Sequence, residues 1–179
     1  MKFGLLVVAA VLVGAVAVVL LLAARKPDSF VVQRSAVIAA PADRIFPLIN
    51  DYRQWTAWSP YETKDPQMKR TFGAVAAGAG ATYAWEGDSN VGAGTMTMVE
   101  SAPPSKVGIR LVMVKPISAE NDVSFTLTPQ GSSTAVTWAM QGVVPFFAKV
   151  IHVFFSMDRM VGGDMEAGLA KLKAVAERG

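Results

Sequence analysis

An uninterrupted apolar run at the N-terminus constrains this chain more than any other feature. The run extends from Phe3 to Ala24, contains no charged or hydrogen-bonding side chain, and is followed by Arg25, Lys26 and Pro27. At ~1.5 Å rise per residue, a helix of this length crosses the ~30 Å hydrocarbon core of a bilayer. We therefore predict an N-terminal transmembrane anchor over residues 1–26, with residues 3–24 in the lipid.

A cleaved secretory signal peptide is the main alternative for this segment, and a buried core helix is the third. Signal peptides usually have an apolar region of only ~7–15 residues, which ends at a small-residue cleavage site before polar sequence. Here Ala23 and Ala24 lead directly into Arg25 and Lys26. The sequence therefore favours an uncleaved single-pass anchor. Because Lys2 and the amino terminus nearly balance the two basic residues at the other end, the side of the membrane stays open.

The formal net charge of +3 belongs to the flanks of the anchor. Lys2, Arg25 and Lys26 account for it, and the other residues carry equal numbers of basic and acidic side chains. Cations at these positions suit anionic lipid head groups. We find no basic stripe with interleaved aromatic residues, so nucleic acid is not predicted as a partner.

The residue types for metal or covalent chemistry are scarce. The chain has no cysteine and a single histidine, His152, which lies in an apolar segment. Neither a His pair at metal-ligand spacing nor a serine nucleophile motif is present. We therefore assign no catalytic residue, no metal ligand and no cofactor.

Residues 27–179 have the length of one domain and the pattern of an antiparallel sheet with a C-terminal helix. Phe30–Ala39 is a predicted strand, and two short helices follow. The first opens at Pro41, and the second starts with Asp51–Trp55 and ends before Ser59-Pro60. Further strands, each with one apolar and one mixed face, are predicted at Ala79–Glu86, Gly92–Glu100, Lys106–Val114, Val123–Thr128 and Thr134–Gln141, with a weaker one near Lys69–Gly73.

The C-terminal segment after Pro145 has helical spacing of its apolar residues. Each glycine costs a helix about 1 kcal/mol relative to alanine, so we expect a break at Gly162–Gly163. The continuous helix is then predicted from about Asp164 to Glu177, across the concave face of the sheet.

Several local strings resemble a known family. SAVIAAPADRIF at residues 35–46, LIND at 48–51 and WSP at 58–60, together with Trp55, resemble the opening of the START-like or SRPBCC superfamily, in its polyketide cyclase/dehydrase-type branch. The resemblance covers residues 30–178. It implies an α+β helix-grip fold, in which a curved antiparallel sheet wraps around a long C-terminal helix and two short helices close one end of a cavity.

The resemblance and the large apolar side chains together favour a ligand-binding domain. We expect a hydrophobic small molecule, such as a lipid, an isoprenoid or a quinone, between the sheet and the C-terminal helix. The ligand would enter between the two short helices and the start of the C-terminal segment. The candidate pocket and gate residues are Trp55, Trp58, Tyr83, Trp85, Met96, Met98, Met113, Phe125, Trp138, Met140, Phe147 and Phe154.

Two other functions stay open at this stage. A cyclase or dehydratase needs a positioned acid or base, for which Tyr83, Glu86, Asp158 and His152 are the candidates. A structural or regulatory membrane protein would instead use its domain to recruit a protein partner, which the sequence does not identify. By alternation, Glu86 and Arg110 lie opposite the apolar face and are predicted to contact water.

Overall fold

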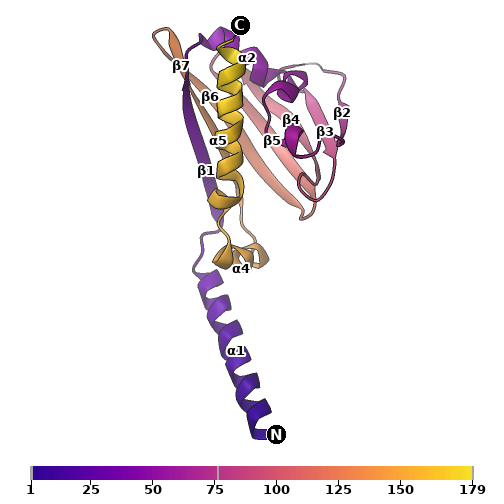
Figure 1. Ribbon diagram of the computed structural model, residues 1–179, viewed down its shortest axis with the longest axis vertical. Coiled ribbons are helices and arrows are strands. Elements are labelled where there is room, and N and C mark those ends of the chain that lie inside the picture. The colour runs from indigo at the N-terminus through magenta and orange to yellow at the C-terminus, as the bar shows by residue number, and fades with distance from the viewer. Residues whose placement is uncertain (1, 76, 179) are drawn as a thin grey trace.

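Helices and one curved sheet make up the computed structural model, which describes residues 2–75 and 77–178 (Figure 1). The N-terminal helix α1 (Lys2–Ala24) projects from the base of the domain, and the long helix α5 (Met157–Ala176) lies across the sheet. The shorter helices are α2 (Ala42–Asn50), the 3-10 helix η1 (Tyr52–Ala57), α3 (Tyr61–Lys64) and α4 (Phe146–Phe154). The strands are β1 (Ser29–Ile38), β2 (Lys69–Phe72), β3 (Thr82–Glu86), β4 (Ala93–Ala102), β5 (Lys106–Lys115), β6 (Ala119–Gln130) and β7 (Ser133–Val143).

The seven strands form one antiparallel sheet in the order β1-β7-β6-β5-β4-β3-β2. Strands β2 to β7 are therefore a simple meander, and β1 joins it beside the last strand. Helix α5 packs against β1, which places it over one side of the concave face. This arrangement confirms the predicted α+β helix-grip architecture.

Strand β6 extends further toward its N-terminal end than the sequence predicts. Residues 119–122 pair with β5, although the apolar alternation begins only at Val123. The reason is electrostatic, because Glu120 and Asp122 on the outer face pair with Arg110 of β5. Cross-strand ion pairs support this part of the strand without an apolar signature.

Helix α5 is continuous through Gly162–Gly163, so the predicted break is wrong. The guanidinium of Arg34 on β1 occupies the space beside Gly162, with its Cζ 2.9 Å from where a Cβ would stand. Arg34 bonds Asp158 at 2.8 Å and Glu166 at 2.5 Å, on either side of this glycine. The hydrogen bond from Arg34 also lowers the pKa of Asp158 below its ordinary value. Gly162 is thus required by a side chain that crosses the helix, and it does not mark a helix end.

The actual break lies six residues earlier, between α4 and α5. Phe155 is extended, and the Ser156 side chain accepts a hydrogen bond from the Arg159 backbone N–H at 3.2 Å, which caps α5. Such caps favour a helix start at the following residue. The segment after Pro145 therefore forms two helices, of which α4 contacts α1 and α5 contacts the sheet.

The two adjacent glycines allow a matched test of the role assigned to Gly162, which is to leave room for the Arg34 side chain. Gly163→Ala is expected to stabilise the protein by roughly 0.5–1 kcal/mol through helix propensity, because open space surrounds its Cβ position. Gly162→Ala should gain less, since its methyl group displaces the Arg34 guanidinium. Unfolding followed by near-UV circular dichroism in detergent measures both changes. In an Arg34→Met background the two gains should become equal; equal gains already in the native background would contradict the assignment.

Candidate functional site

Seven of the twelve predicted pocket residues lie in the hydrophobic core. They are Trp55, Trp58, Tyr83, Met98, Phe125, Trp138 and Met140. Trp58 and Phe125 are fully buried, and the Trp58 ring centroid lies 4.9 Å from that of Trp55 and 5.9 Å from those of Phe125 and Trp138. Around these rings, side chains fill the space between the sheet and the helices.

Trp55 and Trp58 also make hydrogen bonds through their indole groups. The indole Nε1 of Trp55 donates to the carbonyl oxygen of Ile49 at 2.9 Å, and that of Trp58 donates to Leu48 at 2.8 Å. Both acceptors belong to the last turn of α2, where carbonyl groups lack a partner within the helix. These indoles therefore fix η1 to the end of α2.

Three further predicted residues, Trp85, Met96 and Met113, are half-buried on the same face of the sheet. Trp85 lies on β3, Met96 on β4 and Met113 on β5. The cross-strand register places Met96 opposite Tyr83, and Gly94 opposite both Trp85 and Met113. The Trp85 indole donates to the Val91 carbonyl oxygen at 3.0 Å. Part of the concave face is therefore apolar and incompletely covered.

The last two predicted residues, Phe147 and Phe154, lie on α4 and are exposed by 54% and 62%. Helix α4 is at the base of the domain beside α1, whereas α2 lies at the opposite end of the sheet, and η1 is fixed to α2 (Figure 1). The structure therefore does not bring Trp55 and Trp58 together with Phe147 and Phe154, and the expected gate between them is not assembled.

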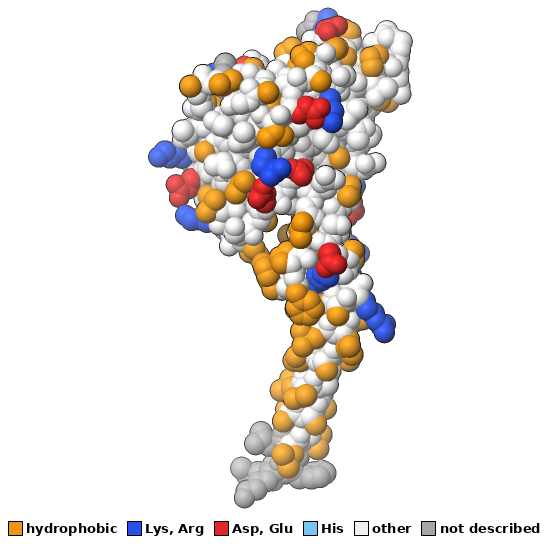
Figure 2. Space-filling model, turned by 180° about the vertical axis from the view of Figure 1, so that it is seen from behind, with side chains coloured by type: hydrophobic (Ala, Val, Ile, Leu, Met, Phe, Trp, Pro, Cys, Tyr) orange, Lys and Arg blue, Asp and Glu red, His pale blue; other side chains and the backbone are white. Residues whose placement is uncertain are grey.

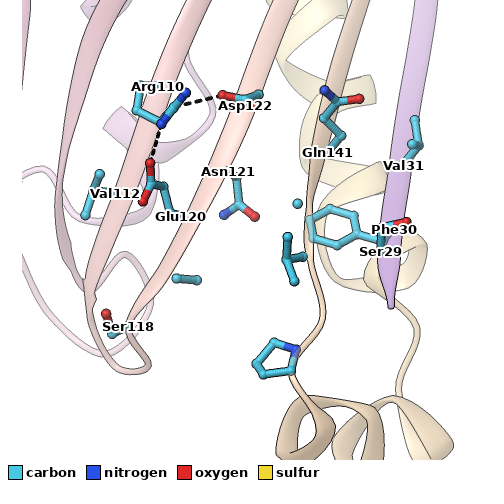
Figure 3. A pocket seen from close by; sticks show the side chains of 14 residues that line it. Ser29, Phe30, Val31, Arg110, Val112, Ser118, Glu120, Asn121, Asp122 and Gln141 are labelled. Atoms are coloured by element: carbon cyan, nitrogen blue, oxygen red, sulfur yellow. Dashed lines mark hydrogen bonds and ion pairs between the residues drawn. The ribbon is translucent and has the colours of Figure 1, made fainter. Parts of the chain in front are cut away.

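A hollow of about 770 Å³ lies at the base of the sheet, where β6 and β7 part (Figure 3). The pairing of these two strands ends at Asn121 and Gly142, and the chain then continues through Pro145 into α4. Side chains from β1, β5, β6 and β7 line the hollow: Ser29, Phe30, Val31, Arg110, Val112, Ser118, Ala119, Glu120, Asn121, Asp122, Gln141, Gly142, Val143 and Pro145.

Asn121 is the most buried polar residue of this lining, with 9% of its surface exposed. Its Oδ1 and the ring of Phe30 occupy the space where a side chain at position 142 would begin, which explains the glycine there. Figure 3 shows Asn121 in the gap between β6 and β7 and the ring of Phe30 beside β7. Among the side-chain hydrogen bonds of the described residues, none involves the Asn121 amide. That amide is therefore available to a ligand group.

Three of the lining residues, Arg110, Glu120 and Asp122, are charged and lie on the outer face of the sheet. Arg110 pairs with Glu120 and lies 2.8 Å from Asp122. Glu86 pairs with Lys115 at 3.2 Å, again with both side chains exposed. The prediction that Arg110 and Glu86 face water is thus confirmed.

The four acid–base candidates do not converge on one place. The Tyr83 hydroxyl donates to Glu62 at 3.1 Å, and burial together with the Glu62 charge raises its pKa, so it stays protonated. Asp158 bonds Arg34, Glu86 bonds Lys115, and His152 lies on α4. Within residues 2–75 and 77–178, no group of three His, Cys, Asp or Glu is placed to hold a metal ion.

Comparison with known proteins identifies the family of this domain. A family model described as polyketide cyclase / dehydrase and lipid transport matches residues 29–177. The chain belongs to this family. The family assignment confirms the resemblance seen in the sequence, and it implies binding of a hydrophobic molecule. The comparison with curated proteins found no match.

Solved structures share the fold of this polyketide cyclase/dehydrase family member at low sequence identity. The di-domain ARO/CYC StfQ from the steffimycin biosynthetic pathway has a TM-score of 0.63 and 10% identity, over 84% of this chain and 51% of that one. A protein from Thermobifida fusca gives 0.60 and 18%, over 83% and 93%. A protein from Chromobacterium violaceum gives 0.55 and 14%, over 85% and 99%. These likenesses establish the fold alone.

Proposed function

We propose that this protein is a membrane-anchored domain that binds a hydrophobic small molecule, such as a lipid, an isoprenoid or a quinone, at the base of its sheet. The family assignment supports the hydrophobic character of the ligand. Helix α1 supports the anchor: its span Leu6–Ala24 has a mean hydropathy of 3.2 and is almost entirely exposed. An exposed apolar helix of this length is stable in a bilayer and costly in water.

One observation carries the proposal: the hollow opens at the end of the domain from which α1 leaves. Ser29, which lines the hollow, follows the end of α1 by five residues, and Pro145, which also lines it, immediately precedes α4. A ligand that leaves the bilayer beside α1 therefore meets the hollow first. Tethering also raises the effective concentration of the domain near molecules dissolved in the membrane.

The lining of the hollow suits an amphipathic ligand. Phe30, Val143 and Pro145 supply apolar surface to the lining. Hydrogen-bonding groups come from the amide of Asn121, on the inner face of the sheet, and from that of Gln141, on the outer face. Separately from the hollow, the half-buried Trp85, Met96 and Met113 provide apolar surface on the concave face.

Obstructing the hollow with a large side chain should weaken ligand binding. Ala119→Trp places an indole at an exposed position of its lining, whereas Thr128→Trp places the same group on an exposed site toward the other end of β6. We expect Ala119→Trp to weaken binding of a fluorescent fatty acid by at least ~10-fold, with Thr128→Trp unchanged. Fluorescence titration of the full chain in nanodiscs measures both. Equal affinities in the two variants would contradict a site at the hollow.

A further inference from the structure

Helix α4 exposes a large apolar surface at the base of the domain. Phe147, Ile151 and Phe154 recur at spacings of four and three, which places them on one side of the helix, and each is at least 38% exposed. The flanking Phe146 and Phe155 are 52% and 62% exposed. Contiguous exposed apolar surface of this kind marks a contact site.

The opposite side of α4 is held against the exit of α1. Lys149 is 7% exposed, and its ammonium group lies 2.5 Å from Asp28 Oδ1, in the short linker between α1 and β1. The Val144 backbone N–H donates to the Asp28 carbonyl oxygen at 2.7 Å, one residue before Pro145, the N-cap of α4. These bonds fix α4 to the chain segment that leaves α1.

The position of α4 along α1 identifies what covers its exposed face. Helix α4 contacts α1, whose C-terminal end carries the fully buried Ala23 and is followed by Arg25 and Lys26. In Figure 1 α4 lies next to this end of α1, at the base of the domain. In Figure 2 hydrophobic side chains continue from α1 onto the base of the domain. If α1 spans a bilayer, its Arg25–Lys26 end lies at the head groups, and α4 lies at the same level.

We infer that α4 is an interfacial helix, whose exposed face inserts into the head-group and acyl boundary of the bilayer that α1 spans. The inference rests on the proposed anchor. Helices with an apolar face and a polar opposite face lie in this plane, buried ~5–10 Å. Because Pro145 belongs to both the cap of α4 and the lining of the hollow, insertion holds the hollow against the lipid surface.

Site-directed spin labelling of the full chain tests this inference, and the absence of cysteine permits single labels. Labels would be placed through Phe147→Cys, Ile151→Cys and Phe154→Cys on α4, with Leu12→Cys in α1 and Ala170→Cys on α5 as references. The protein would be reconstituted into phosphatidylcholine vesicles. Collision rates would be measured with oxygen, which partitions into lipid, and with a water-soluble nickel chelate.

The three α4 labels are expected to show an oxygen-to-nickel collision ratio several-fold above that of Ala170→Cys and below that of Leu12→Cys. Ratios on α4 that match Ala170→Cys, with Leu12→Cys still in lipid, would overturn the interfacial helix but leave the anchor standing. A Leu12→Cys label with the ratio of Ala170→Cys would overturn the anchor itself. Low collision with both reagents on α4, or spin–spin broadening that grows with protein-to-lipid ratio, would indicate a second copy of the chain and would also overturn the inference.

Discussion

Replacing Leu12 and Val16 together by arginine is expected to move this protein from the membrane fraction to the soluble fraction. Both side chains lie near the middle of α1, and they are 61% and 58% exposed. On insertion scales each arginine at the centre of a spanning helix costs roughly 2.5–3.5 kcal/mol, so the pair costs about 5–7 kcal/mol. Carbonate extraction of membranes, followed by quantification of the pellet and supernatant, measures the change.

The matched control for this experiment is the double variant Leu12→Ala and Val16→Ala. It keeps the run apolar and uncharged, so it should remain in the pellet with the native chain. An arginine variant that also stays in the pellet would contradict the anchor. The intact mass of the native chain separates the signal-peptide alternative, since loss of the N-terminal segment would reveal cleavage.

The second large effect is expected at Trp58. Its side chain is fully buried, it contacts the rings of Trp55, Phe125 and Trp138, and its indole N–H bonds α2. Removing a large buried aromatic side chain typically costs about 3–5 kcal/mol, and the Leu48 carbonyl oxygen also loses its donor. Trp58→Ala should therefore lower the free energy of unfolding by at least ~3 kcal/mol, measured by urea titration of the detergent-solubilised chain.

Phe147→Ala provides the comparison for this core substitution. Phe147 is an aromatic residue of the same predicted site, but it is 54% exposed, so its removal should change stability by less than about 1 kcal/mol. Comparable losses in the two variants would show that Trp58 does not have the central packing role seen in the structure.

Local patterns were sufficient to predict most of the fold. Alternation along Lys106–Val114 and Thr134–Gln141 located β5 and β7 to within a residue or two, because one face of each strand is buried. The helix break was misplaced because Gly162 is required by Arg34, a residue 128 positions away in the sequence. A glycine that accommodates a distant side chain has the same local signature as one that ends a helix.

The site was harder to predict than the fold. Large apolar residues such as Trp58, Phe125 and Trp138 suit either a pocket or a core, and their mutual packing makes them core here. The hollow depends on where β6 and β7 part, a property of two strands together. One signal was available, since Asn121 continues the inward-facing series of Val123 and Phe125 as a polar residue on an apolar face.

Native mass spectrometry of the full chain, purified in detergent, is the most direct test of a hydrophobic ligand. Spectra of the native chain, of Ala119→Trp and of Thr128→Trp would be recorded before and after organic extraction. We predict an extractable apolar adduct on the native chain and on Thr128→Trp, and its loss in Ala119→Trp. Retention of the same adduct by Ala119→Trp, or an unliganded mass for all three proteins, would contradict ligand binding at the base of the sheet.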